Sequence, residues 1–254
     1  RAVAVEFNVG VGVSWYPVMG SLARMTRTRK AAVWPAYGGL LIATLIAQVV
    51  GMAAALTLGD SDPTVWMVPF GGAVLGVAVL IFIAFANITS MSSIVYSTIL
   101  AIRQSSGGLL ARVPWKVLTA SFFVLPAIMT FFPQFMYEQF MIFVLVSGAF
   151  LTALCGVALA DYFIVRRQRI DLREMHLGQR GTLYAYPAGV NWAGVVALLL
   201  GAVFYLWLYN PITLETQAAF SVITASLPAA IVAAVAYLLL TRLLHPRRQY
   251  AKEA

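Results

Sequence analysis

The basic residues of this chain are confined to four short stretches that alternate with long apolar segments. All but one of its 17 Lys and Arg residues lie at positions 24–30, 103–116, 166–180 and 242–252, and only Arg1 lies outside them. At their other ends the apolar segments meet acidic residues or uncharged loops. Helices that cross a membrane keep their flanking basic residues on the cytoplasmic side. The pattern therefore predicts a polytopic membrane protein in which every other loop is cytoplasmic.

The composition supports this class and excludes others. Hydrophobic residues make up 61% of the chain and charged residues 10%, whereas about a quarter of the residues of a soluble domain are charged. A net charge of +8 could indicate a nucleic-acid partner. However, the basic residues flank apolar segments in four separate loops, so topology and attraction to anionic lipid explain them. The expected partner is the lipid bilayer, and nucleic acid is not expected.

Seven apolar segments approach the roughly 20 residues that a helix needs to cross the hydrocarbon. They run at about 3–22, 32–58, 69–102, 117–132, 140–165, 190–208 and 218–244. With seven spans the two ends of the chain lie on opposite faces, so Arg1 is expected outside the cell and Ala254 inside. We expect a multi-pass protein of the plasma (inner) membrane with a cytoplasmic C-terminus.

The first span is interrupted by residues that disfavour a continuous helix. Within ten positions it contains Asn8, Gly10, Gly12, Ser14 and Pro17. Broken backbone is tolerated in lipid only where it is buried in protein or lines a cavity. One interpretation is a discontinuous helix at a binding site, as in many secondary transporters. The alternative is close helix packing through small residues.

Two groups of residues could bind small ligands. Trp15 follows the interrupted stretch, and its ring could stack on a flat heterocycle or simply pack against protein or lipid. In the third span, Thr89 and Ser90 follow the Ala86 carbonyl by one turn, and these neutral oxygens suit a dehydrated sodium ion. Alternatively, such hydroxyls bond back to their own helix.

Catalytic and metal chemistry have little support in the sequence. No His, Cys or acidic residues have the spacing of metal ligands, and no nucleophile–base constellation lies within the apolar segments. Cys155 is the single cysteine, so an intrachain disulfide is excluded. We therefore expect neither an enzyme nor a cofactor, apart from a possible coupling sodium ion.

Three stretches together resemble one known family. The first is Ser14-Trp15-Tyr16-Pro17 with the basic residues that follow it, the second is Ala86-x-x-Thr89-Ser90 ending in Val95-Tyr96-Ser97, and the third is Ala160–Arg167 with Gly189–Trp192 and Tyr209–Thr213. In order and spacing they resemble the nucleobase–cation symporter family, whose members include cytosine, purine, allantoin and hydantoin permeases.

The resemblance implies an all-α fold of the LeuT type, in which two inverted five-helix repeats precede two trailing helices. This chain would then be the C-terminal part only, helices six to twelve of twelve. Residues 1–167 would be the second repeat, 168–187 a cytoplasmic loop, and 188–254 the two trailing helices with a cytoplasmic tail. Helices one to five of the same protein would be a missing partner.

The resemblance also assigns site residues. Trp15 would stack on the substrate beside Ser14 and the backbone near Gly12, and the cation ligands would be Ala86, Thr89 and Ser90. The family commonly has Asn where this chain has Met91, and often an acid where it has Ser21. Polar recognition of the substrate could therefore shift to Ser92 or Ser93.

These observations predict a symporter that imports a nucleobase or related small heterocycle with a sodium ion or a proton, by alternating access. The alternative is a complete seven-helix membrane receptor or scaffold with no transport activity. A membrane enzyme is a third class, and the missing catalytic constellation disfavours it.

Overall fold

The computed structural model describes residues 2–59, 62–106, 109–110, 112–170, 186 and 189–244. The chain forms two compact units, Arg1–Tyr16 with Pro133–Ala254 and Pro17–Phe132. Within the described residues every regular element is a helix, and extended pairing is limited to a bridge between Tyr209 and Thr216. The predicted all-α class is confirmed.

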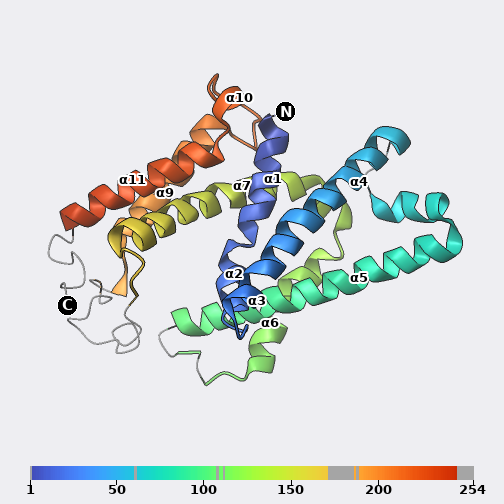
Figure 1. Ribbon diagram of the computed structural model, residues 1–254, viewed down its shortest axis with the longest axis horizontal. Helices are drawn as coiled ribbons and strands as arrows, with labels where there is room; N and C mark the ends of the chain where they lie inside the picture. Colours follow the sequence, from blue (N-terminus) through green and yellow to red (C-terminus); the bar gives the residue numbers. More distant parts are fainter. Residues whose placement is uncertain are drawn as a thin grey trace. The chain divides into compact units, whose positions relative to one another are not determined.

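The first unit is a helical bundle (Figure 1). It contains α1 (Ala2–Ser14), α7 (Pro133–Leu159), the π-helical turn η2 (Ala160–Val165), α9 (Trp192–Leu208), α10 (Phe220–Ile223) and α11 (Ser226–Leu244). α7, α9 and α11 pack against one another, and α1 lies along α7. Each of these helices therefore has a protein-facing side as well as an exposed apolar side.

Small residues let the three central helices approach closely. A Cβ atom on Gly201 of α9 would lie 2.7 Å from the Cβ of Ala233 and 2.9 Å from that of Ala153. A Cβ on Gly156 of α7 would collide with the backbone of Ala230. Because lipid provides no hydrophobic force between helices, their association depends on such close packing. The packing therefore fixes α7, α9 and α11 relative to one another.

A polar network ties η2 to α9 and α11. Arg166 Nε forms an ion pair with Asp161 Oδ2 at 2.5 Å, and the Tyr237 hydroxyl donates to Asp161 Oδ1 at 2.7 Å. Asn191 Oδ1 caps α9 by accepting from the Gly194 amide, and its Nδ2 donates to the Tyr237 hydroxyl at 3.4 Å. Asp161 is therefore engaged as a structural partner of Arg166.

The second unit consists of long helices joined by short turns. It contains α2 (Tyr16–Ala23), which begins at the last residue of the first unit, α3 (Arg29–Ala36), η1 (Tyr37–Ala43), α4 (Thr44–Leu58), α5 (Pro63–Ser105) and α6 (Trp115–Met129). α3, η1 and α4 form one continuous helical rod, and α5 packs on α6. Many large apolar side chains of α4 and α5 are exposed, as expected where helices face lipid.

Local chemistry explains where these helices begin and bend. Thr28 caps α3, and Asp62 caps α5 by accepting from the Thr64 amide. Hydrogen bonds from the Thr64 hydroxyl and amide lower the pKa of Asp62. Within α5, Gly72 has φ 74°, which side-chain-bearing residues rarely adopt, and there the helix kinks. The span predicted at 69–102 therefore lies mostly after the kink.

The predicted spans agree with the helices, with three differences in detail. One is the seventh predicted span, 218–244, which is interrupted at Thr224 and Ala225, so that α11 begins at Ser226. Among the described residues, four helical rods are long and apolar enough to cross a membrane, namely Arg29–Leu58, Pro63–Ser105, Pro133–Val165 and Ser226–Leu244. Trp115–Met129 and Trp192–Leu208 are shorter apolar helices, and the first predicted span is divided into α1 and α2. The assignment of residues 1–167 and 188–254 to repeat and trailing helices stays a prediction. Most of the predicted loop at 168–187 lies outside the described residues.

The packing of α7 on α11 can be tested by substitution. We expect Gly156→Ala to destabilise the protein by about 1–3 kcal/mol, because the added methyl must push apart two backbones. Gly51→Ala in α4 is the matched control, since no atom lies within 4 Å of its Cβ position and alanine is the better helix former. Thermal unfolding in detergent measures both. Equal melting temperatures for the two variants would contradict the close contact.

Candidate substrate and cation sites

The first candidate site lies at the break between α1 and α2. α1 ends at Ser14, α2 begins at Tyr16, and Trp15 is the single residue between them. Pro17 explains the position of the break, because proline has no N–H to donate and its ring clashes with the carbonyl four residues earlier. The first span is thus interrupted, but only at Trp15, because α1 stays helical through Asn8, Gly10 and Gly12. The stacking role of Trp15 stays a prediction.

Gly10 and Gly12 of α1 have different surroundings, so the interpretation as close helix packing applies to one of them and not to the other. A Cβ on Gly10 would lie 3.3 Å from the side chain and carbonyl of Val144, and one on Gly148 would lie 3.2 Å from the Gly10 Cα. Gly10 therefore serves close packing of α1 on α7. No such contact occurs at Gly12, whose Cβ position has no atom within 4 Å. Gly12 therefore leaves open space beside the helix about one turn before the break, although its backbone is still helical.

The residues around the break combine a half-buried aromatic ring with accessible backbone. Trp15 is half-buried, and Gly12 and Ser14 are exposed or partly exposed within their unit. The Ser14 hydroxyl donates to the Val11 carbonyl at 2.6 Å, and the Trp15 amide donates to the Gly12 carbonyl at 3.3 Å. A carbonyl has a second lone pair, so these oxygens retain capacity for a donor on a flat ligand stacked against the ring.

The predicted cation ligands lie on α5 of the second unit. The Thr89 hydroxyl donates to the Ala86 carbonyl at 2.8 Å, so two of the three predicted oxygens are adjacent. Ala86 and Thr89 are exposed within this unit, and Ser90 is half-buried. The hydrogen bond is the back-bonding arrangement that the sequence left open as an alternative. An ion at this position would require the hydroxyl to turn its proton away, so that both oxygens face the ion.

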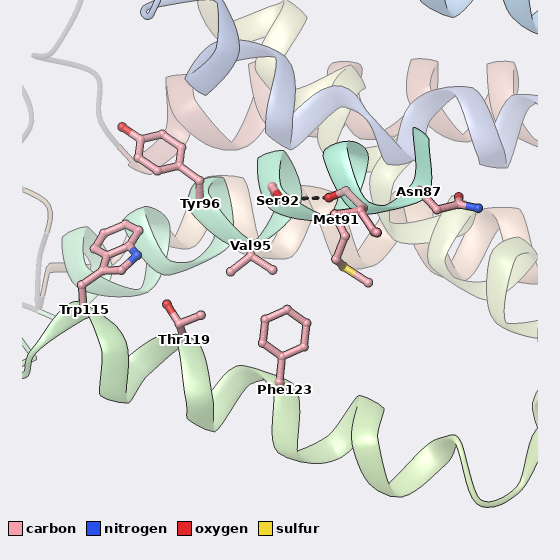
Figure 2. A pocket seen from close by; sticks show the side chains of 9 residues that line it. Asn87, Met91, Ser92, Val95, Tyr96, Trp115, Thr119 and Phe123 are labelled. Carbon is pink, nitrogen blue, oxygen red and sulfur yellow. Dashed lines mark hydrogen bonds between the residues drawn. The ribbon is translucent and has the colours of Figure 1, made fainter. Parts of the chain in front are cut away.

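The Ser92 and Ser93 hydroxyls donate hydrogen bonds to carbonyls of their own helix. Ser92 donates to the Ile88 carbonyl at 2.8 Å and Ser93 to the Thr89 carbonyl at 3.3 Å. Only Ser92 of the pair lines a cavity between α5 and α6. This cavity has a volume of about 610 Å³ and is lined by Asn87, Ile88, Met91, Ser92, Val95, Tyr96, Trp115, Thr119 and Phe123. Met91 and Val95 point from α5 toward Thr119 and Phe123 of α6 (Figure 2).

One end of the cavity is aromatic and carries a cation. The Tyr96 and Trp115 rings lie 5.7 Å apart, and the Arg103 guanidinium lies 5.7 Å from the Trp115 centroid. Arg103 also donates to the Val113 carbonyl at 2.9 Å. Among the described residues no hydrogen-bond partner is found for the buried Thr119 hydroxyl. A flat ligand in this cavity would meet an aromatic wall formed by Tyr96 and Trp115.

The sequence reasoning missed the contribution of α6 to this cavity. Trp115, Thr119 and Phe123 are spaced four residues apart, which places them on one face of a helix. That spacing was the available signal, although similar spacing occurs on many packed helices. The residues on α1 and those on α5 belong to different units, so each set is a candidate site in its own unit. In the described residues no group of three or more His, Cys, Asp or Glu could hold a metal ion.

The apolar helices define a multi-pass membrane protein. Comparison with known families then gives its relationship. The sequence model of a family described as permeases for cytosine/purines, uracil, thiamine and allantoin matches residues 5–237. The chain belongs to this permease family. Membership points to a transporter and away from a seven-helix receptor or an enzyme.

Curated relatives match over shorter segments. The allantoin permease of Saccharomyces cerevisiae is 41% identical over 54 residues, which are 20% of this chain and 8% of that protein. The uracil permease of the same yeast has the same values. Its uridine permease is 31% identical over 93 residues, which are 36% of this chain and 12% of that protein. These segments span a small part of each relative. No solved structure matches the chain.

The buried Thr119 hydroxyl, for which the described residues offer no partner, leads to a testable expectation. Thr119→Val should leave the melting temperature unchanged or raise it, because a buried hydroxyl without a partner gains nothing from staying polar. Thr152→Val is the control. Its hydroxyl donates to the Gly148 carbonyl at 2.6 Å inside the first unit, so that variant should lose about 1 kcal/mol. If both variants lose equal stability, the Thr119 hydroxyl has a hydrogen-bond partner within the protein.

Proposed function

We propose that the protein is a symporter that imports a nucleobase or related small heterocycle together with a sodium ion or a proton. The observation that carries this proposal is the break at Trp15, which sets an aromatic ring beside open backbone in a chain of the permease family. In secondary transporters, discontinuous helices place unsatisfied backbone groups at the substrate. The chain would supply helices six to twelve of the complete transporter.

The substrate class follows from the chemistry that the break offers. Stacking on Trp15 favours a planar ring, and backbone carbonyls near Gly12 favour ring N–H groups. Relatives are named for allantoin, uracil and uridine, which share a ring with adjacent N–H and C=O groups. We expect this chain to take a small heterocycle with that pattern, with Ser14 beside it and Ser92 or Ser93 as further polar contacts.

The coupling ion would bind between neutral oxygens on α5. Ala86 and Thr89 already bring two oxygens to 2.8 Å, and Ser90 is the next residue along. A sodium ion in this position needs no buried negative charge, but it needs ligands from outside this turn as well. Ion binding would stabilise one conformation of the transporter by its differential affinity for that state. Alternating access would then move the substrate across the plasma membrane, with the C-terminus in the cytoplasm.

Trp15→Ala should weaken heterocycle binding about tenfold to a hundredfold. Loss of a base–aromatic stack costs about 1–3 kcal/mol, and each 1.4 kcal/mol corresponds to about a factor of ten. The measurement is equilibrium binding to the purified full-length protein, with allantoin, uracil, uridine, cytosine and hydantoin as ligands. Trp15→Phe should retain most of the affinity, because it keeps a flat ring.

Trp34→Ala is the matched control for this experiment. Trp34 lies on α3 and is 70% exposed, so its loss removes an indole without touching the break. Equal affinities for the Trp15→Ala, Trp34→Ala and unaltered proteins would refute the assignment of Trp15. Binding of none of the five ligands by the unaltered protein would refute the proposed substrate class.

Thr89→Ala should raise the sodium concentration needed for half-maximal transport at least about tenfold, since one ion–oxygen contact is lost. Thr57→Ala is the control, because the Thr57 hydroxyl also bonds back to its own helix, to the Ala53 carbonyl at 2.7 Å. Sodium titrations of heterocycle uptake compare the two. Superimposable sodium titrations for the Thr89→Ala and Thr57→Ala variants would contradict the assignment of Thr89 as a sodium ligand. Uptake by the unaltered protein that does not depend on sodium would indicate coupling to protons instead.

A further inference from the structure

Glu6 is the only acidic or basic side chain that is fully buried among the described residues. It lies on α1, and its carboxylate is bonded to residues more than two hundred positions away. Glu6 Oε1 accepts from the Ala225 amide at 2.5 Å and from the Ser226 amide at 2.9 Å. Glu6 Oε2 accepts from the Ser226 hydroxyl at 2.5 Å. The carboxylate therefore caps the N-terminus of α11 from another helix.

This arrangement compensates a buried charge without a basic partner. The first amides of a helix have no partner within it, and the helix dipole favours a negative charge at that end. The buried Tyr205 of α9 interacts electrostatically with the same carboxylate. One side chain of α1 is thus bonded to the start of α11 and lies near α9, and both helices belong to the closely packed bundle of the first unit.

The contacts of α1 are concentrated in its first ten residues. Phe7 packs edge-on against Phe140 with the ring centroids 6.2 Å apart, and Gly10 packs on α7 at Val144 and Gly148. Two residues later, the Cβ position of Gly12 has open space around it. The bonds of Glu6 and the close glycine contacts that attach α1 to the bundle thus lie at or before Gly10.

We propose that Glu6 is a positioning residue for Trp15. A helix is a stiff rod, and the nine residues from Glu6 to Trp15 correspond to about 13 Å of rise. A bond that fixes the height and rotation of α1 at residue 6 therefore fixes where the break and its aromatic ring lie. Calling Trp15 a substrate residue rests on the proposed function, whereas the anchoring of α1 by Glu6 does not.

The experiment measures the position of the break without any substrate. Ser14→Cys places a thiol one residue before Trp15 with little change in size, and the native, partly buried Cys155 of α7 serves as internal reference. The full-length protein carrying Ser14→Cys is treated with a small maleimide in membrane vesicles. Peptide mass spectrometry then follows the labelling rates of the introduced thiol and of Cys155 separately.

Glu6→Gln is the main variant. An amide offers one acceptor oxygen, and its NH2 group would face N–H or O–H donors, so part of the cap is lost. We expect the labelling rate of the introduced thiol to change at least about fivefold, which corresponds to a population shift of about 1 kcal/mol, while that of Cys155 stays within about twofold. Glu138→Gln is the control, because it neutralises an exposed glutamate on α7 of the same unit and should change neither rate.

Ser226→Ala is a second variant that tests the same contact if Glu6→Gln does not fold. It removes the hydroxyl bonded to Glu6 Oε2 and leaves the two backbone amides, so a smaller change at the introduced thiol, in the same direction, is expected. Unchanged labelling of that thiol in the folded variants would overturn the proposal. A parallel rise at the introduced thiol and at Cys155 would also overturn it, since it indicates general loosening. Heterocycle binding by the unaltered protein is measured separately, so failure of the substrate assignment would leave the labelling result readable.

Discussion

In a bilayer, every backbone N–H and C=O group must find a partner inside the protein, and this requirement governs where the helices of this chain can be interrupted. Most of the described chain meets it with continuous helix. At the break after Ser14, the serine hydroxyl and the Trp15 amide return to carbonyls of the preceding turn. At the start of α11, the first amides are satisfied by Glu6 of a different helix. These two arrangements have different consequences. The bonds at the break stay within α1 and so do not hold it against another helix. The bonds of Glu6 join α1 to α11 and hold α1 in place.

Within the first unit, close packing holds α7, α9 and α11 together, and the polar contacts of Glu6 attach α1 to them. Gly156 and Gly201 bring α7, α9 and α11 together so tightly that a single methyl group would not fit. Packed interiors of this kind are bistable or rigid rather than continuously deformable. α1 joins this bundle through Gly10 and Glu6 in its first ten residues, and its remaining turn is open. The bonds that attach α1 to the bundle thus precede the break at Trp15.

The sequence predicted the class, the helices and the interruption of the first span, since hydropathy and proline act locally. It did not predict that the break would fall at a single residue or that Gly10 and Gly12 would have different surroundings, because these depend on where α7 lies. Trp115 and Thr119 were missed as cavity residues for the same reason, since their neighbours on α5 are not adjacent in sequence. The contacts of Glu6 could not be predicted either, because they depend on Ser226, which is 220 positions away. Local sequence patterns therefore predicted the helices, whereas the surroundings of single residues depend on contacts between residues that are distant in the sequence.

The two interpretations of Thr89 that the sequence left open are physically compatible. A hydroxyl that bonds back to the Ala86 carbonyl satisfies its own helix when no ion is present. The same contact holds two oxygens at a separation from which both could face one cation. Because a hydrogen bond of this kind contributes about 1 kcal/mol net, an ion with several oxygen ligands can replace it at small cost. Back-bonding and ion binding at Thr89 are thus alternatives that would use the same two oxygens. Competition between the Thr89 hydrogen bond and the ion is the property that separates a coupling site from an ordinary helical hydroxyl.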